Sequence, residues 1–248
     1  MTLPLTPSPV EGEKTAKLRV ADIFSGIGGF SFGLEATGHF ETVLMCERAP
    51  FQRRILAKHW PAVKCVEDVR DISVINSDVI CGGFPCQPFS TASRGRKVAE
   101  DMWPEMSRIV EASSPTIVIA ENVKPGPIEN AAADLQGYGY TVTVRNISAD
   151  DCGAPHGRSR WWVIAHPYDE SEFQRALDAE VAKLPELCAG LWTAEAYRRA
   201  IRVPHGLPSG VDEPARIALG NAVMPVIPQV IGYAIARAEG RASRKDGA

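Results

Sequence analysis

Short apolar segments alternate with helix-patterned segments from residue 18 onward, and this alternation constrains the fold more than any other feature of the chain. Strands that are buried on both faces read as continuous runs of aliphatic and β-branched residues, as these segments do. Helices between such strands cover both faces of a parallel sheet. We therefore expect an α/β protein with a Rossmann-like, mostly parallel sheet. The expected strands span residues 18–23, 42–46, 63–66, 78–81 and 116–120. Of the expected helices, the first ends near residue 36, and the other two span 50–59 and 102–111.

The later part of the chain follows a different pattern. Strands are expected at 140–144 and 161–165, with little helical patterning between them. Antiparallel strands need no long helical crossover, so we predict that this pair forms an antiparallel edge of the sheet. The apolar spacing and the turn residues then predict helices over 171–184, 193–201 and 222–238, with a Gly- and Pro-rich loop over 204–214.

The charge balance and the lack of long apolar runs exclude several classes of protein. The 27 Lys+Arg and 30 Asp+Glu residues give a net charge of −3. This balance argues against a histone-like, non-specific nucleic-acid binder, although it leaves room for a local basic cleft. No apolar run approaches the ~20 residues of a membrane span. Residues 1–17, rich in Pro and Thr, predict a disordered tail and lack the apolar core of a signal peptide. We therefore expect no membrane association, a cytoplasmic location and reduced cysteines.

Three features follow the first three expected strands. A Gly-rich turn at 24–29 comes first, Glu47 follows the second strand, and Asp68 follows the third. Ligands of open α/β sheets bind outside the carboxyl ends of the strands. Glycines let backbone N–H groups approach a ligand, a carboxylate suits ribose hydroxyls, and a second one can accept from an exocyclic amine. A tight turn or a helix cap explains each feature alone equally well. Together they indicate an adenosine-containing ligand.

Cys86 is the candidate nucleophile. It lies between Pro85 and Pro88, so it cannot belong to a helix or a central strand, and we expect it on a stiff loop at the ligand edge of the sheet. None of the six cysteines forms a C-x-x-C pair, which argues against zinc-ribbon and thioredoxin-like sites, and we expect no metal. The other five cysteines are interpreted as packing residues.

Several motifs, taken in order, resemble those of the DNA (cytosine-5) methyltransferase family. They are Asp-Ile-Phe-Ser-Gly-Ile-Gly-Gly at 22–29, Phe-Pro-Cys-Gln-Pro-Phe-Ser at 84–90, Glu-Asn-Val at 121–123, Gly-Ala-Pro-His-Gly-Arg-Ser-Arg at 153–160 and Ala-Leu-Gly-Asn-Ala-Val at 218–223. A single motif carries a high false-positive risk, whereas several in the family's order do not. The resemblance implies the class I S-adenosylmethionine-dependent methyltransferase fold, and the length is similar to that of compact phage and prophage members.

The resemblance also implies a mechanism on double-stranded DNA. The Cys86 thiolate would add to C6 of a flipped-out cytosine, so that C5 can accept a methyl group from S-adenosylmethionine. Glu121 would bind the N3 and exocyclic amine edge, Arg160 would hold O2, and Arg158 would support the Cys86 loop. In this reading the cofactor contacts come from Phe24, Ser25, Gly26, Ile27, Glu47 (ribose), Asp68 (adenine amine), Pro85, Met102, Asn221 and Val223.

Structural roles remain open for three of these residues. Arg160 is adjacent to Trp161 and could stack on its ring, Glu121 could cap a turn, and Asn221 could be the N-cap of the last helix. His156 stands where the family usually has Gln, and Met102 where it has an aliphatic residue. We expect neither change to abolish activity.

The main departure from the family is a reduced target-recognition region. The implied organisation is a tail (1–17), a catalytic domain (18–167), the reduced region (168–214) and a C-terminal helix returning to the catalytic domain (215–248). We expect a monomer that reads a short sequence or little sequence at all, and an additional chain for target recognition stays open. An RNA (tRNA) cytosine-5 methyltransferase and a catalytically inactive DNA-binding remnant or subunit are the alternatives. Two basic clusters could contact phosphates or form solvated faces. One consists of Arg94, Arg96 and Lys97, and the other of Arg198, Arg199 and Arg202.

Overall fold

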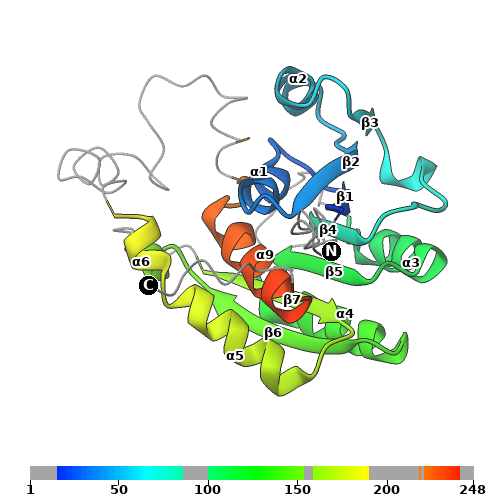
Figure 1. The fold of residues 1–248 in the computed structure, drawn as a ribbon. Coiled ribbons are helices and arrows are strands. Elements are labelled where there is room, and N and C mark those ends of the chain that lie inside the picture. Colours follow the sequence, from blue (N-terminus) through cyan, green and yellow to red (C-terminus); the bar gives the residue numbers. More distant parts are fainter. Residues whose placement is uncertain (1–15, 86–99, 154–158, 190–217, 219–220, 241–248) are drawn as a thin grey trace, which may run out of the picture.

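The computed structural model describes residues 16–85, 100–153, 159–189, 218 and 221–240. Within these residues seven strands form one sheet in the order β3-β2-β1-β4-β5-β7-β6 (Figure 1). The neighbours from β3 to β5 pair in parallel, whereas β7 is antiparallel to both β5 and β6. The predicted fold class and antiparallel edge are confirmed. The strands are β1 (Leu18–Asp22), β2 (Phe40–Cys46), β3 (Lys64–Val66), β4 (Val79–Gly83), β5 (Ile117–Asn122), β6 (Thr141–Ile147) and β7 (Arg160–His166).

Helices cover both faces of the sheet and enclose its core. On one face α1, α5 and α9 pack over strand residues such as Val20 and Ile119, and on the other α3 and α4 pack over Ala21 and Val118. Neighbouring residues of one strand thus belong to opposite faces, as the pleat requires. The helices are α1 (Gly29–Ala36), α2 (Pro50–His59), α3 (Trp103–Ser113), α4 (Pro125–Gly137), α5 (Glu170–Val181), α6 (Leu184–Leu187) and α9 (Val226–Ala238), with 3-10 turns η1 (Val69–Asp71) and η2 (Asp150–Cys152).

Two helices differ from the sequence expectation because of proline. Helix α4 was not expected, since it opens on Pro-Gly-Pro; the prolines occupy its first turn, where backbone N–H groups have no intrahelical partner. Helix α9 begins at Val226 rather than at residue 222, with Pro225 as its N-cap. Asn221 is therefore not the N-cap of this helix. The expected helix over 171–184 ends at Val181, and the separate helix α6 follows. The expected tail, the helix over 193–201 and the loop over 204–214 lie outside the described residues, except for Ala16 and Lys17.

Helix α9 returns from the end of the chain to pack against α1 and α5 (Figure 1). Glycines in α1 allow this close approach. A Cβ atom at Gly29 would lie 2.5 Å from the Val223 carbonyl oxygen, and one at Gly33 would lie 2.1 Å from the Pro225 carbonyl oxygen. The segment around Val223 is therefore held directly beside the start of α1.

The Asp22 carboxyl is fully buried at the end of β1. Its Oδ2 accepts a hydrogen bond of 3.0 Å from the Ser31 hydroxyl. Burial raises the pKa of Asp22 to about 7, because removal from water disfavours the charged form more than the Ser31 hydrogen bonds favour it. This carboxyl lies directly before the Gly-rich turn at residues 24–29. A change in its protonation therefore acts on the structure beside that turn.

No helix in the described part of the chain combines the length and apolar character needed to cross a bilayer.

Replacing Gly33 with Ala is expected to lower the free energy of unfolding by about 2–3 kcal/mol, because the new methyl group overlaps backbone atoms of the α9 segment. Urea denaturation measures the effect. Gly126→Ala is the matched control, since no atom lies within 4 Å of a Cβ at this position in α4. Equal stability of the two variants would contradict the proposed close packing of α1 on α9.

Replacing Asp22 with Asn is expected to change how stability depends on pH. The folded chain keeps the Asp22 proton up to a pH of about 7, whereas the unfolded chain loses it near its ordinary pKa of 3.8. This group therefore removes stability as the pH rises from about 4 through about 7, by up to ~4 kcal/mol. As the pH rises from 4.5 to 8, the free energy of unfolding of Asp22→Asn should increase relative to that of the wild type. A difference that does not vary with pH would refute the shifted pKa.

Candidate active site

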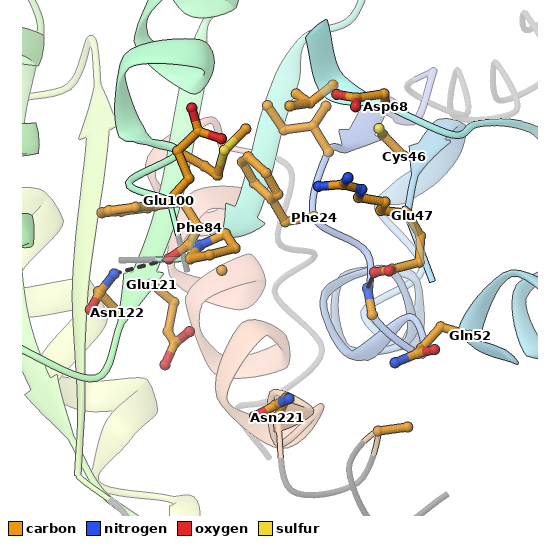
Figure 2. A pocket seen from close by; sticks show the side chains of 18 of the residues that line it. Phe24, Cys46, Glu47, Gln52, Asp68, Phe84, Glu100, Glu121, Asn122 and Asn221 are labelled. Atoms are coloured by element: carbon orange, nitrogen blue, oxygen red, sulfur yellow. Dashed lines mark hydrogen bonds between the residues drawn. The ribbon is translucent and has the colours of Figure 1, made fainter. Parts of the chain in front are cut away.

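A cavity of about 580 Å³ opens at the carboxyl edge of the parallel strands (Figure 2). Its walls come from the turns after β1, β2 and β3 on one side and from the ends of β4, β5 and β7 on the other. Parallel strands bring their carboxyl ends to one edge, which explains why residues far apart in the sequence meet here. The predicted site residues that line the cavity are Phe24, Gly26, Glu47, Asp68, Pro85, Met102, Glu121, Arg160 and Asn221.

Some predicted site residues are not in the cavity wall. Ser25, Ile27 and Val223 lie outside its lining. The Ser25 hydroxyl instead donates to the Asp22 carbonyl at 2.6 Å and accepts from the Cys46 N–H at 3.2 Å, so it joins the turn after β1 to β2. Cys86 and Arg158, with His156 and the basic clusters, lie outside the described residues.

Glu47 holds the Gly-rich turn in place. Its Oε2 accepts from the Gly26 N–H at 2.8 Å, and its Oε1 accepts from the Ala49 N–H at 2.7 Å. Each carboxylate oxygen has a further lone pair, so both remain able to accept from a hydroxyl group in the cavity. Gly28 closes the turn with a φ of +90°, where a side chain would also overlap the Trp60 ring.

Asp68 belongs to a charged chain along one wall of the cavity. Its Oδ1 accepts from the Arg70 N–H at 3.0 Å, and its Oδ2 lies 3.2 Å from Nη1 of Arg70. The pKa of Asp68 is lowered, chiefly by that backbone N–H and then by the guanidinium. Arg70 also pairs with Glu100 and contacts the Met102 sulfur at 3.8 Å. This wall is therefore negatively charged at Asp68 and anchored to the segment before α3.

Sequence reasoning did not identify several polar residues of the cavity. Arg70 and Glu100 belong to no motif, and a charged residue two positions after a strand-end aspartate carries no sequence signal. Their positions depend on tertiary structure, because η1 and the segment before α3 come together only in the fold. The polar lining residues that were not predicted are Arg48, Gln52, Glu67, Arg70, Glu100 and Asn122.

Glu121 and Arg160 form an ion pair on the other side of the cavity. Arg160 Nε lies 2.7 Å from Glu121 Oε1, and the Glu121 side chain is only 9% exposed. The two residues come from the adjacent antiparallel strands β5 and β7. Glu121 thus pairs with a guanidinium. Asn122, not Glu121, accepts from the Lys124 N–H at 3.1 Å at the start of α4.

Asn122, the residue after Glu121 on β5, holds the backbone just after the end of β4. Its amide donates to the Phe84 carbonyl at 3.0 Å, as the dashed line in Figure 2 shows. Phe84 and the exposed Pro85 directly precede Cys86 in the sequence. Pro85, the last described residue before Cys86, therefore lies in the cavity wall directly after a backbone carbonyl that Asn122 holds.

Three buried cysteines, Cys46, Cys81 and Cys152, are unsuited to nucleophilic chemistry. Cys46 lines the cavity, but burial raises the pKa of its thiol to about 12, with further contributions from the neighbouring Cys65, Glu47 and Asp68. Burial also raises the pKa of Cys81 and that of Cys152. Because the thiolate is the reactive form, these residues act as packing groups. Among the described residues no cluster of three or more potential metal ligands occurs.

Known proteins resemble this chain in sequence and in fold. Type II methyltransferase M2.BsuMI of Bacillus subtilis is 28% identical over 168 residues, which cover 62% of this chain and 43% of that protein. Type II methyltransferase M.AplI of Arthrospira platensis is 32% identical over 162 residues, 61% of this chain and 46% of that protein. The chain thus spans less than half the length of these relatives.

A solved structure matches nearly the whole chain. It is a protein described as a DNA modification methyltransferase encoded within an E. coli prophage, with a TM-score of 0.64 and 17% identity, covering 90% of this chain and 100% of that one. At this identity the match supports the fold alone. The family described as C-5 cytosine-specific DNA methylase matches residues 18–190, which include the Gly-rich turn, Glu47, Asp68 and the Glu121–Arg160 pair. The chain belongs to the C-5 cytosine-specific DNA methylase family.

Proposed function

We propose that this chain transfers a methyl group from S-adenosylmethionine to C5 of cytosine in double-stranded DNA. One observation carries the proposal. A single cavity joins the turn held by Glu47 and the carboxylate of Asp68 to the Glu121–Arg160 ion pair, and the chain enters the Cys86 segment from its wall. The turn held by Glu47, together with Asp68, suits a nucleoside. The Glu121–Arg160 ion pair suits the hydrogen-bonding edge of a base.

The cavity fits the proposed cofactor in size and in donor set. About 580 Å³ lies within the range of small-molecule sites. Glu47 retains acceptor capacity for ribose hydroxyls, and Asp68 for an exocyclic amine. When bound, S-adenosylmethionine supplies an electrophilic methyl group on a positively charged sulfur. Phe24, Gly26, Pro85, Met102 and Asn221 would complete the contacts, while Ser25, Ile27 and Val223 would act from behind the wall.

The chain's own residues would carry the steps on the base. The Cys86 thiolate forms a bond to C6, so that C5 becomes an enamine carbon able to take the methyl group. Glu121 binds the N3 and amine edge, and Arg160 orients Glu121 and holds O2. Loss of the C5 proton to water and breakage of the C6–S bond then restore the C5=C6 double bond and release the Cys86 thiolate. Arg158 supports the Cys86 loop in this proposal. In a duplex the stack covers both faces of the base, so it must be flipped out.

The beginning of the predicted recognition region supports weak sequence reading. Residues 170–187 form α5 and α6, and buried residues such as Phe173 and Leu177 join the main core instead of a separate domain. We therefore propose that residues 170–187 cover the sheet, and that the chain reads a short sequence or little sequence, or uses an additional chain for recognition. We also propose that the chain is a monomer, that it is located in the cytoplasm and that it is of phage or prophage origin. The proposed domain boundaries lie at residues 167 and 214.

Replacing Cys86 with Ser should reduce transfer of labelled methyl groups by about 10⁴-fold or more, because the nucleophile is lost. The assay uses S-adenosylmethionine with duplex DNA or with tRNA. Cys65→Ser is the control, since this half-buried cysteine on β3 does not line the cavity. Transfer to tRNA alone would favour the RNA methyltransferase, and no Cys86-dependent transfer to either would favour the inactive remnant.

Bisulfite sequencing of DNA from cells that express the chain should show methylated cytosines in a short or loosely defined sequence context. The physical reason is the small amount of chain available between β7 and α9 for contacts with base edges. Methylation confined to one long recognition sequence would contradict this expectation.

A further inference from the structure

Two consecutive glycines end β4: Gly83 lines the cavity, and Gly82 packs against Phe24, which also lines it. A Cβ atom at Gly82 would lie 3.0 Å from Cδ2 and 3.2 Å from the backbone nitrogen of Phe24. A Cβ atom at Gly83 would lie 2.8 Å from Oε2 of Glu121. Successive residues of a strand point to opposite faces of a sheet, which explains the separation. Figure 2 shows Phe24 and Glu121 at separate parts of the cavity.

Backbone conformation does not explain the glycine at either position. Neither Gly82 nor Gly83 has a positive φ, so an alanine could adopt the same backbone without strain. The property that glycine supplies here is space. At Gly83 that space is occupied by the carboxylate of Glu121.

The Glu121 carboxylate is held between two neighbours. Oε1 lies 2.7 Å from Arg160 Nε, and Oε2 lies over Gly83, the residue paired with Glu121 across the parallel strands β4 and β5. A methyl group at position 83 would come closer to Oε2 than real Cβ contacts do, so the carboxylate would have to move. Because Oε2 is the end of a flexible side chain, the fold can absorb this movement, whereas the ion pair and the base-binding geometry change.

We propose that Gly83 is a positioning residue that sets the place of the Glu121 carboxylate, separately from the cofactor half of the site. This inference rests on the proposed function, in which Glu121 binds the edge of the flipped cytosine. Gly82 provides an internal comparison, because an alanine there would press on Phe24, a wall of the cofactor cavity.

Steady-state kinetics of the full chain, with duplex DNA, would separate the two glycines. Gly83→Ala should lower kcat by about 100-fold, the size of effect seen when one stabilising group is lost. Its KM for S-adenosylmethionine and its Kd for S-adenosylhomocysteine should stay within about twofold of the wild type, since no cofactor contact changes. Gly82→Ala should instead raise that KM by about tenfold, with a smaller effect on kcat.

A double-mutant comparison distinguishes positioning of Glu121 from a general disturbance. If Gly83→Ala acts through the Glu121 carboxylate, the double variant Gly83→Ala/Glu121→Gln should be no slower than Glu121→Gln alone. Gly82→Ala should instead add its full effect to that of Glu121→Gln. Additive losses for Gly83→Ala, or a raised KM for the cofactor, would overturn the inference. So would a Gly83→Ala variant that fails to fold, because the overlap would then not be absorbed by the side chain.

A crystal structure of Gly83→Ala decides the inference even if the proposed function fails. If the wild-type chain transfers no methyl group, the function is wrong, but the side-chain geometry can still be measured. A Glu121 carboxylate displaced from Arg160 supports the inference. A carboxylate in its wild-type position beside an alanine at residue 83 overturns it.

Discussion

Parallel pairing of β3, β2, β1, β4 and β5 is the constraint on which the rest of this structure depends. It brings five carboxyl ends to one edge, and the cavity lined by the described site residues lies at that edge. Glu47 and Asp68 follow adjacent strands, and Glu121, the last residue but one of β5, pairs with Gly83 at the end of β4. The antiparallel strand β7 then adds Arg160, because its first residue lies next to the last residues of β5. The strand order thus brings the proposed cofactor-binding residues and the proposed base-binding residues to one cavity.

Glycines fix the distances between the parts that this pairing assembles. Gly28 allows the turn to pack under Trp60, and Gly29 and Gly33 allow the α9 segment to approach α1. Without a side chain at Gly83, the Glu121 carboxylate occupies the space above β4. A methyl group at Gly29 or Gly33 would overlap backbone atoms of the α9 segment, whereas one at Gly83 would displace only the Glu121 carboxylate. The walls of the cavity and the segments around it are therefore positioned by missing side chains as well as by polar contacts.

Much of this arrangement could be predicted from the sequence, and the exceptions have physical causes. The buried strands read as apolar runs, so their positions and the Rossmann-like fold were predicted, with bounds that differ by a few residues at most. Helix α4 was missed because prolines mark turns as often as helix starts. Positions just after expected strands pointed to Glu47 and Asp68, and motifs pointed to Glu121 and Arg160; all four line the cavity. Arg70 and Glu100 were missed because only tertiary packing brings them together.

The central claim is that the cofactor cavity, the Glu121–Arg160 pair and the Cys86 thiol act as one site. Trapping with duplex DNA that contains 5-fluorocytosine tests it most directly, because fluorine at C5 cannot leave as the proton does and the C6–S bond should persist. Mass spectrometry should find a one-to-one protein–DNA adduct that carries one added methyl group, through a peptide containing Cys86, only when S-adenosylmethionine is present. An adduct on another cysteine, or none under conditions where the wild type methylates ordinary DNA, would contradict the account.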